Sequence, residues 1–181
     1  MPKRAERERE FEEFARARAT ALHRSAWLLC RDEHEAQDLV QEALTKVFVM
    51  WMRPLVRIDN PVAYAHATLT RTFLSARRRK SSGEVPVAEF PDRAHDDESE
   101  STTTRLVADA ALARLSPLDR AIVVARYVDD VSVADTATLV GLSPGAVRTR
   151  AMRALEKLRG WLEHPAPLVV PAAPDTEEVH A

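Results

Sequence analysis

The sequence has little of what builds disulfide scaffolds, metal centres or β-sheets. Its 181 residues include one cysteine, four glycines and 6% aromatic side chains, whereas alanine, leucine, arginine and glutamate dominate. The lone cysteine, Cys30, has no partner for an internal disulfide, and one thiol cannot form a zinc finger. This composition predicts an all-α protein and fits a cytoplasmic location.

Long apolar runs and catalytic motifs are missing as well. No uninterrupted apolar run reaches the roughly 18 residues of a membrane span, and the first ten residues, MPKRAERERE, lack the apolar core of a signal peptide. The six histidines stand in no metal-ligand spacing, and there is no glycine-rich phosphate loop. The carboxylates of residues 32–42 have no histidine or lysine partners in the pattern for acid–base catalysis. We therefore expect no membrane segment, no metal, no cofactor and no enzymatic activity.

Charge is segregated along the chain, although the net charge is only −2. Residues 71–80 contain five basic residues and no acid, and residues 144–159 contain five basic residues and one acid. Between these segments, residues 84–100 carry seven acids and one arginine. Two cationic segments suit phosphate backbones. The acidic run is either a solvated, disordered spacer or a segment that lies in a basic channel.

The spacing of apolar residues predicts a series of helices. Two core-facing helices are expected over 11–30 and 31–52, with Arg53-Pro54 ending the second and Asn60-Pro61 starting a third that runs to Lys80. Residues 81–103 form a linker, and four short helices follow over 104–163. The last segment, 164–181, is rich in proline and alanine and is expected to be disordered.

The most informative stretch covers residues 132–159. Ser132 is placed to cap a short helix that ends at Gly141, and Ser143-Pro144 starts a second helix. The second helix has an apolar stripe that includes Val147, with basic residues on the other face. A helix, a glycine-containing turn and a basic helix are typical of the helix-turn-helix, whose second member enters the major groove. The alternative is an ordinary amphipathic helix pair with a solvated face.

Three segments resemble a known family. Residues 36–48 (AQDLVQEALTKVF) are similar to the polymerase-binding helix of region two in extracytoplasmic-function (ECF, group IV) sigma factors of the sigma-70 family. Residues 60–79 are similar to their promoter-melting and −10-recognition helix, and residues 115–159 to their region four. The likeness covers roughly residues 11–162, and the basic tail of the second segment is similar to that of the actinobacterial SigE-like subgroup. It implies two small helical domains, a region two bundle (1–80) and a region four helix-turn-helix (104–163), joined by a flexible acidic linker.

The resemblance also implies three sets of site residues. One set would bind the coiled coil of the largest polymerase subunit: Asp38, Leu39, Gln41, Glu42 and Thr45. A second would hold the separated −10 strand: Arg57, Asp59, Asn60, Tyr64, Arg71, Arg77, Arg78, Arg79 and Lys80. A third would contact the −35 element: Ser143, Arg148, Thr149, Arg150 and Arg153. A plain solvated face is the alternative for the first set.

The partners that the resemblance implies are core RNA polymerase, through its coiled coil and flap, and promoter DNA. An anti-sigma factor is a further possible partner, and the chain would work in the cytoplasm, on the nucleoid, through the polymerase. Three other interpretations remain open: a stand-alone helix-turn-helix regulator, an interaction protein without a DNA role, and a nucleic-acid enzyme, although the last lacks candidate catalytic groups.

Overall fold

The computed structural model describes residues 4–54, 56–83 and 110–163. Within these ranges all regular structure is helical, and no strand occurs, which confirms the all-α prediction. The predicted linker over 81–103 lies outside the described residues from position 84 on, and so do the first part of the helix expected from Arg105 and the whole tail 164–181. The helices are α1 (Arg4–Cys30), α2 (Glu33–Trp51), α3 (Pro61–Gly83), α5 (Pro117–Tyr127), α6 (Val133–Val140) and α7 (Pro144–Glu163).

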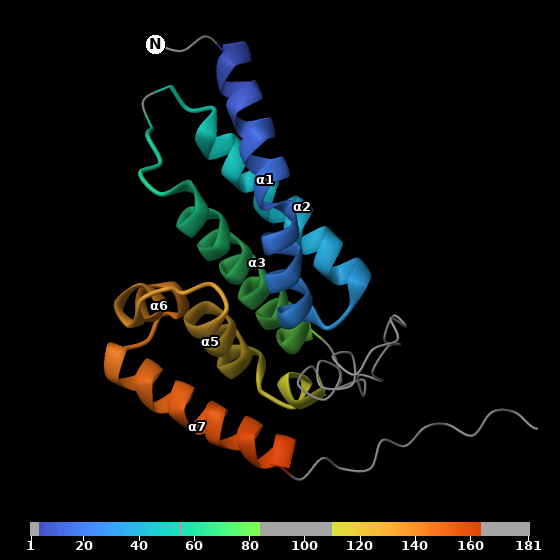
Figure 1. Cartoon of the computed structure of the whole chain (residues 1–181), viewed down its shortest axis with the longest axis vertical. Coiled ribbons are helices and arrows are strands. Elements are labelled where there is room, and N and C mark those ends of the chain that lie inside the picture. The colour runs from blue at the N-terminus through green and yellow to red at the C-terminus, as the bar shows by residue number, and fades with distance from the viewer. Residues whose placement is uncertain (1–3, 55, 84–109, 164–181) are drawn as a thin grey trace, which may run out of the picture.

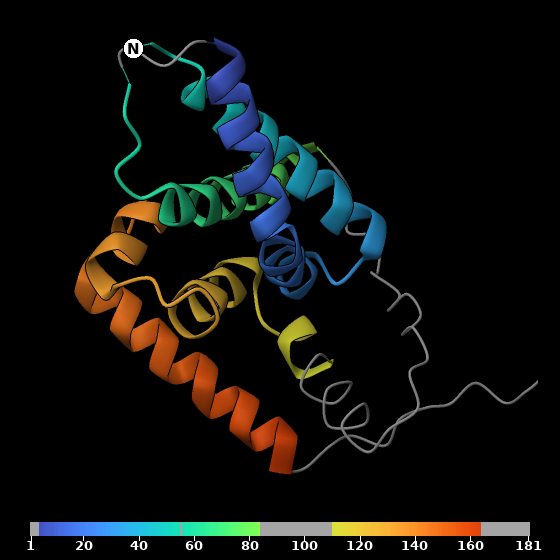
Figure 2. The same ribbon diagram turned by 45° about the horizontal axis from the view of Figure 1, so that its top comes forward.

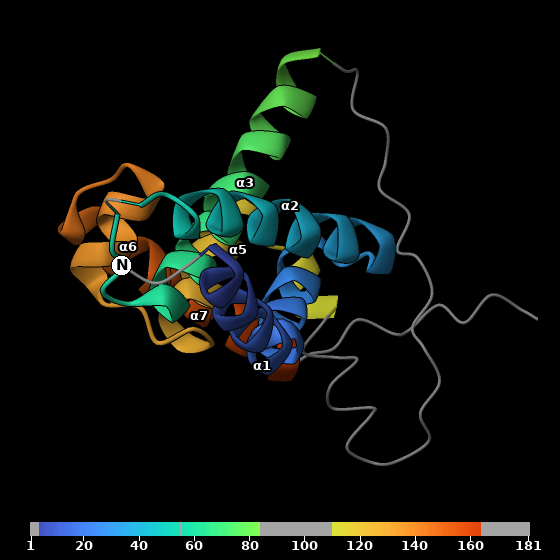
Figure 3. The same ribbon diagram turned by 90° about the horizontal axis from the view of Figure 1, so that it is seen from above.

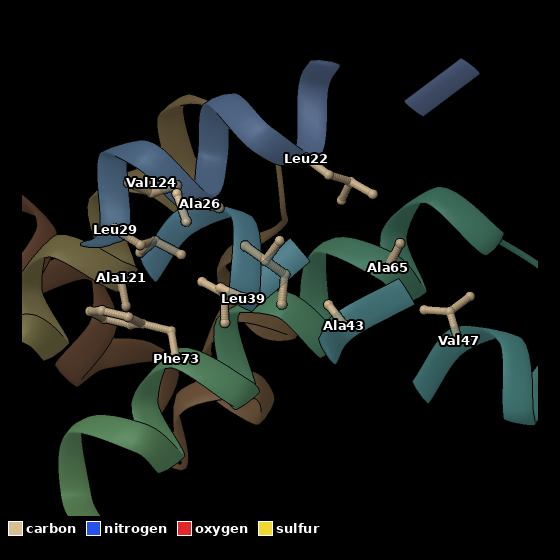
Figure 4. Packing of buried hydrophobic residues seen from close by; sticks show 12 residues of the cluster. Leu22, Ala26, Leu29, Leu39, Ala43, Val47, Ala65, Phe73, Ala121 and Val124 are labelled. Carbon is tan, nitrogen blue, oxygen red and sulfur yellow. The ribbon is translucent and has the colours of Figure 1, made fainter. Parts of the chain in front are cut away.

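Helices α1, α2 and α3 form a bundle (Figure 1). Arg31 takes a left-handed conformation (φ 64°) between α1 and α2, and Asp32 then caps α2 by accepting from the Glu35 N–H at 2.6 Å. At the start of α3, the Asn60 Oδ1 accepts from the Ala63 N–H at 3.0 Å. Figure 4 shows the small and branched side chains that fill the bundle, with Phe73 the largest fully buried one.

Two helices extend beyond their core-facing segments. Helix α1 starts at Arg4, where the Arg4 Nε lies 2.9 Å from the Glu8 Oε1, one turn on, and stabilises the exposed first turns. Helix α3 continues three residues past its expected end at Lys80, to Gly83. Gly83 follows the basic run, and its low helix propensity favours an end of the helix at this position.

The caps of the second half are those that the sequence predicts. Ser116, Ser132 and Ser143 each accept, through the hydroxyl, from the backbone N–H three residues on, at 3.0 to 3.2 Å. Gly141 ends α6 in the left-handed region, with φ at 72°. A helix, a short turn and a longer helix result, which is the expected helix-turn-helix geometry.

Helix α5 lies at the centre of the molecule. Residues 120–125 are all buried, the charged Arg120 among them. Ala121 and Val124 join the core of α1–α3, while Ile122 packs with α6 and α7. Figures 1 and 2 show α5 between the bundle and α7. The two halves of the chain therefore pack against each other, a contact that the sequence alone did not indicate.

Candidate nucleic-acid interface

The exposed face of α2 carries four of the five residues predicted to bind polymerase: Asp38, Gln41, Glu42 and Thr45. Leu39 is only 6% exposed and belongs to the core of the bundle. Its side chain therefore anchors α2 and does not share the exposed face. The Lys46 Nζ donates to the Glu42 Oε1 at 2.7 Å and to the Thr72 Oγ1 on α3 at 2.9 Å, which fixes Glu42 against the bundle.

The loop before α3 and the first turns of that helix hold the next group of predicted residues. Arg57, Asp59 and Asn60 are exposed, and so is Arg71, three turns along α3. The Asn60 side chain uses its oxygen as the α3 cap, which leaves its amide NH₂ group to donate elsewhere. Tyr64 is half-buried and packs against the core of the bundle.

The basic end of α3 extends from the bundle (Figure 3). Two of its cations share one carboxylate on α2: the Arg77 Nη2 lies 2.8 Å from the Glu35 Oε2, and the Lys80 Nζ lies 2.7 Å from the Glu35 Oε1. Arg77 also lies over the Phe73 ring, at 5.4 Å from its centroid. Arg78 and Arg79 are exposed. The predicted −10 surface is therefore cationic, but Glu35 offsets part of its charge.

Helix α7 presents Arg148, Thr149 and Arg153 to solvent, as a groove-reading helix requires. Arg150, the fourth residue of this helix that was predicted to contact DNA, points toward α5 instead. Its Nη1 lies 2.7 Å from the Asp119 Oδ1 on that helix. Arg150 is half-buried and ties α7 to the rest of its half.

Two residues near these surfaces were missed by the reading of the sequence. Met152 is 54% exposed on α7, beside the predicted groove-facing residues. With 100° per residue, Met152 lies about 140° from Val147 around the helix and therefore outside the apolar stripe. An apolar residue at such a position predicts an exposed apolar side chain. The sequence identifies Asp119 only as an acid in the first turn of the helix that Ser116 caps. That pattern does not indicate its ion pair with α7.

Neither a membrane nor a metal site is indicated within the described ranges. No helix there is long and apolar enough to cross a bilayer. Among the same residues, no group of three histidine, cysteine or acidic side chains is placed to hold a metal ion.

The two halves match two family models. Residues 11–83 match Sigma-70 region 2, and residues 105–158 match Sigma-70, region 4. The chain therefore belongs to the sigma-70 family. Within this family it is an ECF sigma factor of actinobacterial type, as its curated relatives show.

The relatives are matched over most of their length. An RNA polymerase sigma-E factor of Streptomyces avermitilis is 37% identical over 158 residues, covering 85% of this chain and 86% of the relative. A sigma-E factor of Streptomyces coelicolor is 35% identical over 154 residues, covering 83% and 84%. The ECF sigma factor SigL of Mycobacterium tuberculosis is 32% identical over 152 residues, covering 80% and 84%.

Two solved structures share the fold. One is the sigma factor RpoE in complex with the anti-sigma factor NepR from Bartonella quintana, with a TM-score of 0.63 and 21% identity, covering 87% of this chain and 99% of that one. The other is CnrH in complex with the cytosolic domain of CnrY, with a TM-score of 0.60 and 21% identity, covering 88% and 91%.

Proposed function

We propose that this ECF sigma factor binds core RNA polymerase through α2, brings it to promoters with −35 and −10 elements, and helps to separate the DNA strands. The observation that carries the proposal is the presence of three exposed surfaces on one chain. They are the polar face of α2, the cationic end of α3 and the cationic face of α7. The first lies in the region 2 match together with the second, and the third lies in the region 4 match.

The docking surface on the polymerase coiled coil would be formed by Asp38, Gln41, Glu42 and Thr45. These polar side chains lie on a helix whose opposite face is anchored in the core by Leu39. A rigid helix with exposed acids can bind a partner with little loss of conformational entropy. The acids also favour a basic partner surface through electrostatic complementarity.

The −10 element would be held by the loop before α3 and by α3 itself. Flipping a base out of the stack costs a few kcal/mol, and stacking on an aromatic ring returns about 1 to 3 kcal/mol per base. Tyr64 offers such a ring, and the amide NH₂ of Asn60 offers a donor to a captured base. Arg57 and Arg71 are exposed cations for the strand backbone, with Asp59 beside Asn60 in the loop. The cations at residues 77–80 extend this path along the helix.

The −35 element would be contacted by α7, with Arg148, Thr149 and Arg153 toward the major groove and Ser143 near the backbone. An arginine that donates two hydrogen bonds to guanine contributes about 1 to 3 kcal/mol of discrimination. We assign Arg150 chiefly to positioning, because its guanidinium already pairs with Asp119. The polymerase flap would hold region four while α7 reads the DNA.

Regulation by an anti-sigma factor belongs to the same proposal, since one of the two solved structures with this fold holds a sigma factor in complex with an anti-sigma factor. The chain would act in the cytoplasm, on the nucleoid, as a subunit of the polymerase and without catalysis of its own. A stand-alone regulator of helix-turn-helix type is the competing function. The polar α2 face counts against it, because duplex binding alone has no use for that surface.

Run-off transcription tests the proposal. The purified chain and an actinobacterial core polymerase are mixed with linear templates whose −35 and −10 positions are randomised, and the transcripts are sequenced. We expect transcripts enriched in one pair of elements, from reactions that contain both proteins. Sequence-specific duplex binding by the chain alone, without polymerase-dependent transcripts, would instead establish the stand-alone regulator.

A further inference from the structure

A buried carboxylate joins the two halves of the molecule. Asp129 follows α5, and its side chain is 2% exposed. The Ser25 hydroxyl on α1 donates to the Asp129 Oδ1 at 2.5 Å, and the His66 Nδ1 on α3 lies 3.0 Å from the same oxygen. Ser25 is 1% exposed and His66 is 8% exposed. One side chain of the second half is thus enclosed by two helices of the first.

The surroundings of this contact are a mixture of apolar and polar groups. Ala121 and Val124 of α5 lie against the bundle core, where Figure 4 shows Ala121 beside Phe73. The Arg120 guanidinium, in a residue only 4% exposed, lies 5.9 Å from the centroid of the Phe73 ring. The apolar contribution of α5 to the contact is therefore one small and one medium side chain.

Such a composition is typical of contacts that open. Permanent interfaces are large and nearly as apolar as a protein core, whereas contacts between domains that move are smaller and more polar. A buried carboxylate is favourable only while its partners stay in place, since an unpaired charge in the interior is strongly destabilising. When the halves separate, Ser25, His66, Arg120 and Asp129 present groups that water solvates well. The contact can therefore be specific when closed and harmless when open.

Promoter binding requires such an opening, a step that rests on the proposed function. The −35 and −10 elements are separated by roughly 25 base pairs, or about 85 Å of duplex at 3.4 Å per pair. A compact fold of the 133 described residues (4–54, 56–83 and 110–163) has a radius of gyration of about 14 Å, which makes it roughly 35 Å across. The 26 residues of 84–109 can span at most about 90 Å. The chain thus has the length to reach both elements, but not while α5 is seated on α1 and α3.

We propose that Asp129, with Ser25 and His66, is a latch that holds α5–α7 against α1–α3 in the free chain. Closing the latch buries one side of α3 under α5 and the turn after it, and keeps α7 from the position that the −35 element demands. Core polymerase must break the latch to use both DNA surfaces. The stability of the latch then sets the fraction of chains that can bind, and the apparent affinity for polymerase scales with that fraction.

The distance between the halves can be measured by single-molecule FRET on the free chain. Dyes are placed on cysteines at the exposed positions Ala17 of α1 and Glu163 of α7, in a Cys30→Ser background so that no other thiol is labelled. Asp129→Ala removes the carboxylate of the latch. Asp130→Asn is the matched control, because it removes one negative charge from the next residue, which is exposed, and asparagine tolerates its positive φ of 51°.

We expect one high-transfer population in the background chain and in Asp130→Asn. In Asp129→Ala the ratio of open to closed molecules should rise roughly tenfold or more, because the hydrogen bond from the Ser25 hydroxyl to the buried carboxylate is lost. Ser25→Ala should shift the ratio the same way, and the double variant should add less than the two single effects combined. Far-ultraviolet circular dichroism of each variant checks that the helices remain.

An Asp129→Ala chain with unchanged helicity and the same transfer distribution as Asp130→Asn would overturn the latch, as would purely additive effects in the double variant. These measurements use no polymerase and no DNA, so their outcome is independent of run-off transcription. The latch can be refuted while the proposed function is confirmed, and the reverse is equally possible. If both hold, Asp129→Ala should bind core polymerase more tightly by the factor that FRET gives for the open fraction. Unchanged affinity with a changed open fraction would refute the role of the latch in polymerase binding.

Discussion

Arg150 of α7 forms an ion pair with Asp119 of α5, at 2.7 Å between Nη1 and Oδ1. The same carboxylate accepts from the Ser116 hydroxyl at 2.8 Å. The cap of one helix and a basic residue of another therefore meet at one acid. This arrangement fixes α7 relative to α5 and pairs one of the five positive charges of residues 144–159 with an acid of α5.

Arg150→Ala should therefore act on stability. The Arg150 side chain is 42% exposed, so solvent screening limits the loss to about 0.5 to 1 kcal/mol, or about 1 to 3 °C in the melting temperature. Differential scanning calorimetry measures the change. Arg153→Ala on the exposed face of the same helix is the control, and it should leave the melting temperature unchanged. Equal melting temperatures for the two variants would contradict the positioning role of Arg150.

Arg148→Ala and Arg153→Ala should act on DNA. If the arginine donates to guanine, the variant should lose about 1 to 3 kcal/mol of affinity for the preferred −35 element and become less selective at that base pair. If the arginine contacts phosphate only, the affinity should fall by the same factor for all sequences. The slope of log affinity against log salt concentration should then become shallower by about one. Holoenzyme binding to a panel of single-base −35 variants distinguishes the two. A footprint that neither substitution changes would exclude α7 as the −35 reader.

The sequence predicted local structure better than long-range contacts. The caps at Ser132, Gly141 and Ser143 depend on residues at most four positions apart, so the pattern of side chains alone indicates them. The pairing of Glu35 with Arg77 joins residues 42 positions apart, and that of Ser25 with Asp129 joins residues 104 positions apart. Such pairs depend on how helices pack, which no local pattern contains.

The α2 face should be required for polymerase binding. The Asp38→Ala, Glu42→Ala double variant should lose core polymerase in a pull-down while its helicity is unchanged, because both acids are exposed and neither belongs to the core. The matched control is Glu12→Ala, Glu13→Ala on α1, which removes the same charge from another exposed face. Retained binding by the α2 variant, or equal loss in both, would refute the docking surface.

Cys30 should be unreactive in the folded chain. Burial, with the charge of Glu35 acting in the same direction, raises the pKa of the Cys30 thiol from 9.0 to about 12. At pH 8 the thiolate is then about 10³-fold scarcer than in an unperturbed thiol, so alkylation by iodoacetamide should be slower by a similar factor than in the urea-unfolded chain. Comparable rates in the folded and unfolded chains would contradict this.

The same shift makes stability depend on pH. Only the unfolded chain ionises Cys30 between pH 9 and about 12, so the contribution of this thiol is complete below pH 9 and is lost as the pH rises through that window. The free energy of unfolding of the natural chain should therefore fall relative to that of Cys30→Ser as the pH is raised from 8 to 10.5, roughly the range where urea titrations are practical. A constant difference between the two would show that the thiol ionises alike in both states.

Glu35 should limit how strongly the end of α3 holds DNA. Its carboxylate engages both Arg77 and Lys80, which a phosphate backbone would otherwise attract. Glu35→Gln should therefore tighten holoenzyme binding to a single-stranded −10 oligonucleotide and steepen its salt dependence by about 0.7 for each additional phosphate contact. Fluorescence anisotropy over a salt series gives both quantities. Glu33→Gln serves as the control, because Glu33 lies on the same helix but pairs with His23 of α1. Weaker binding by Glu35→Gln would mean that the carboxylate positions the two cations for DNA and does not compete with it.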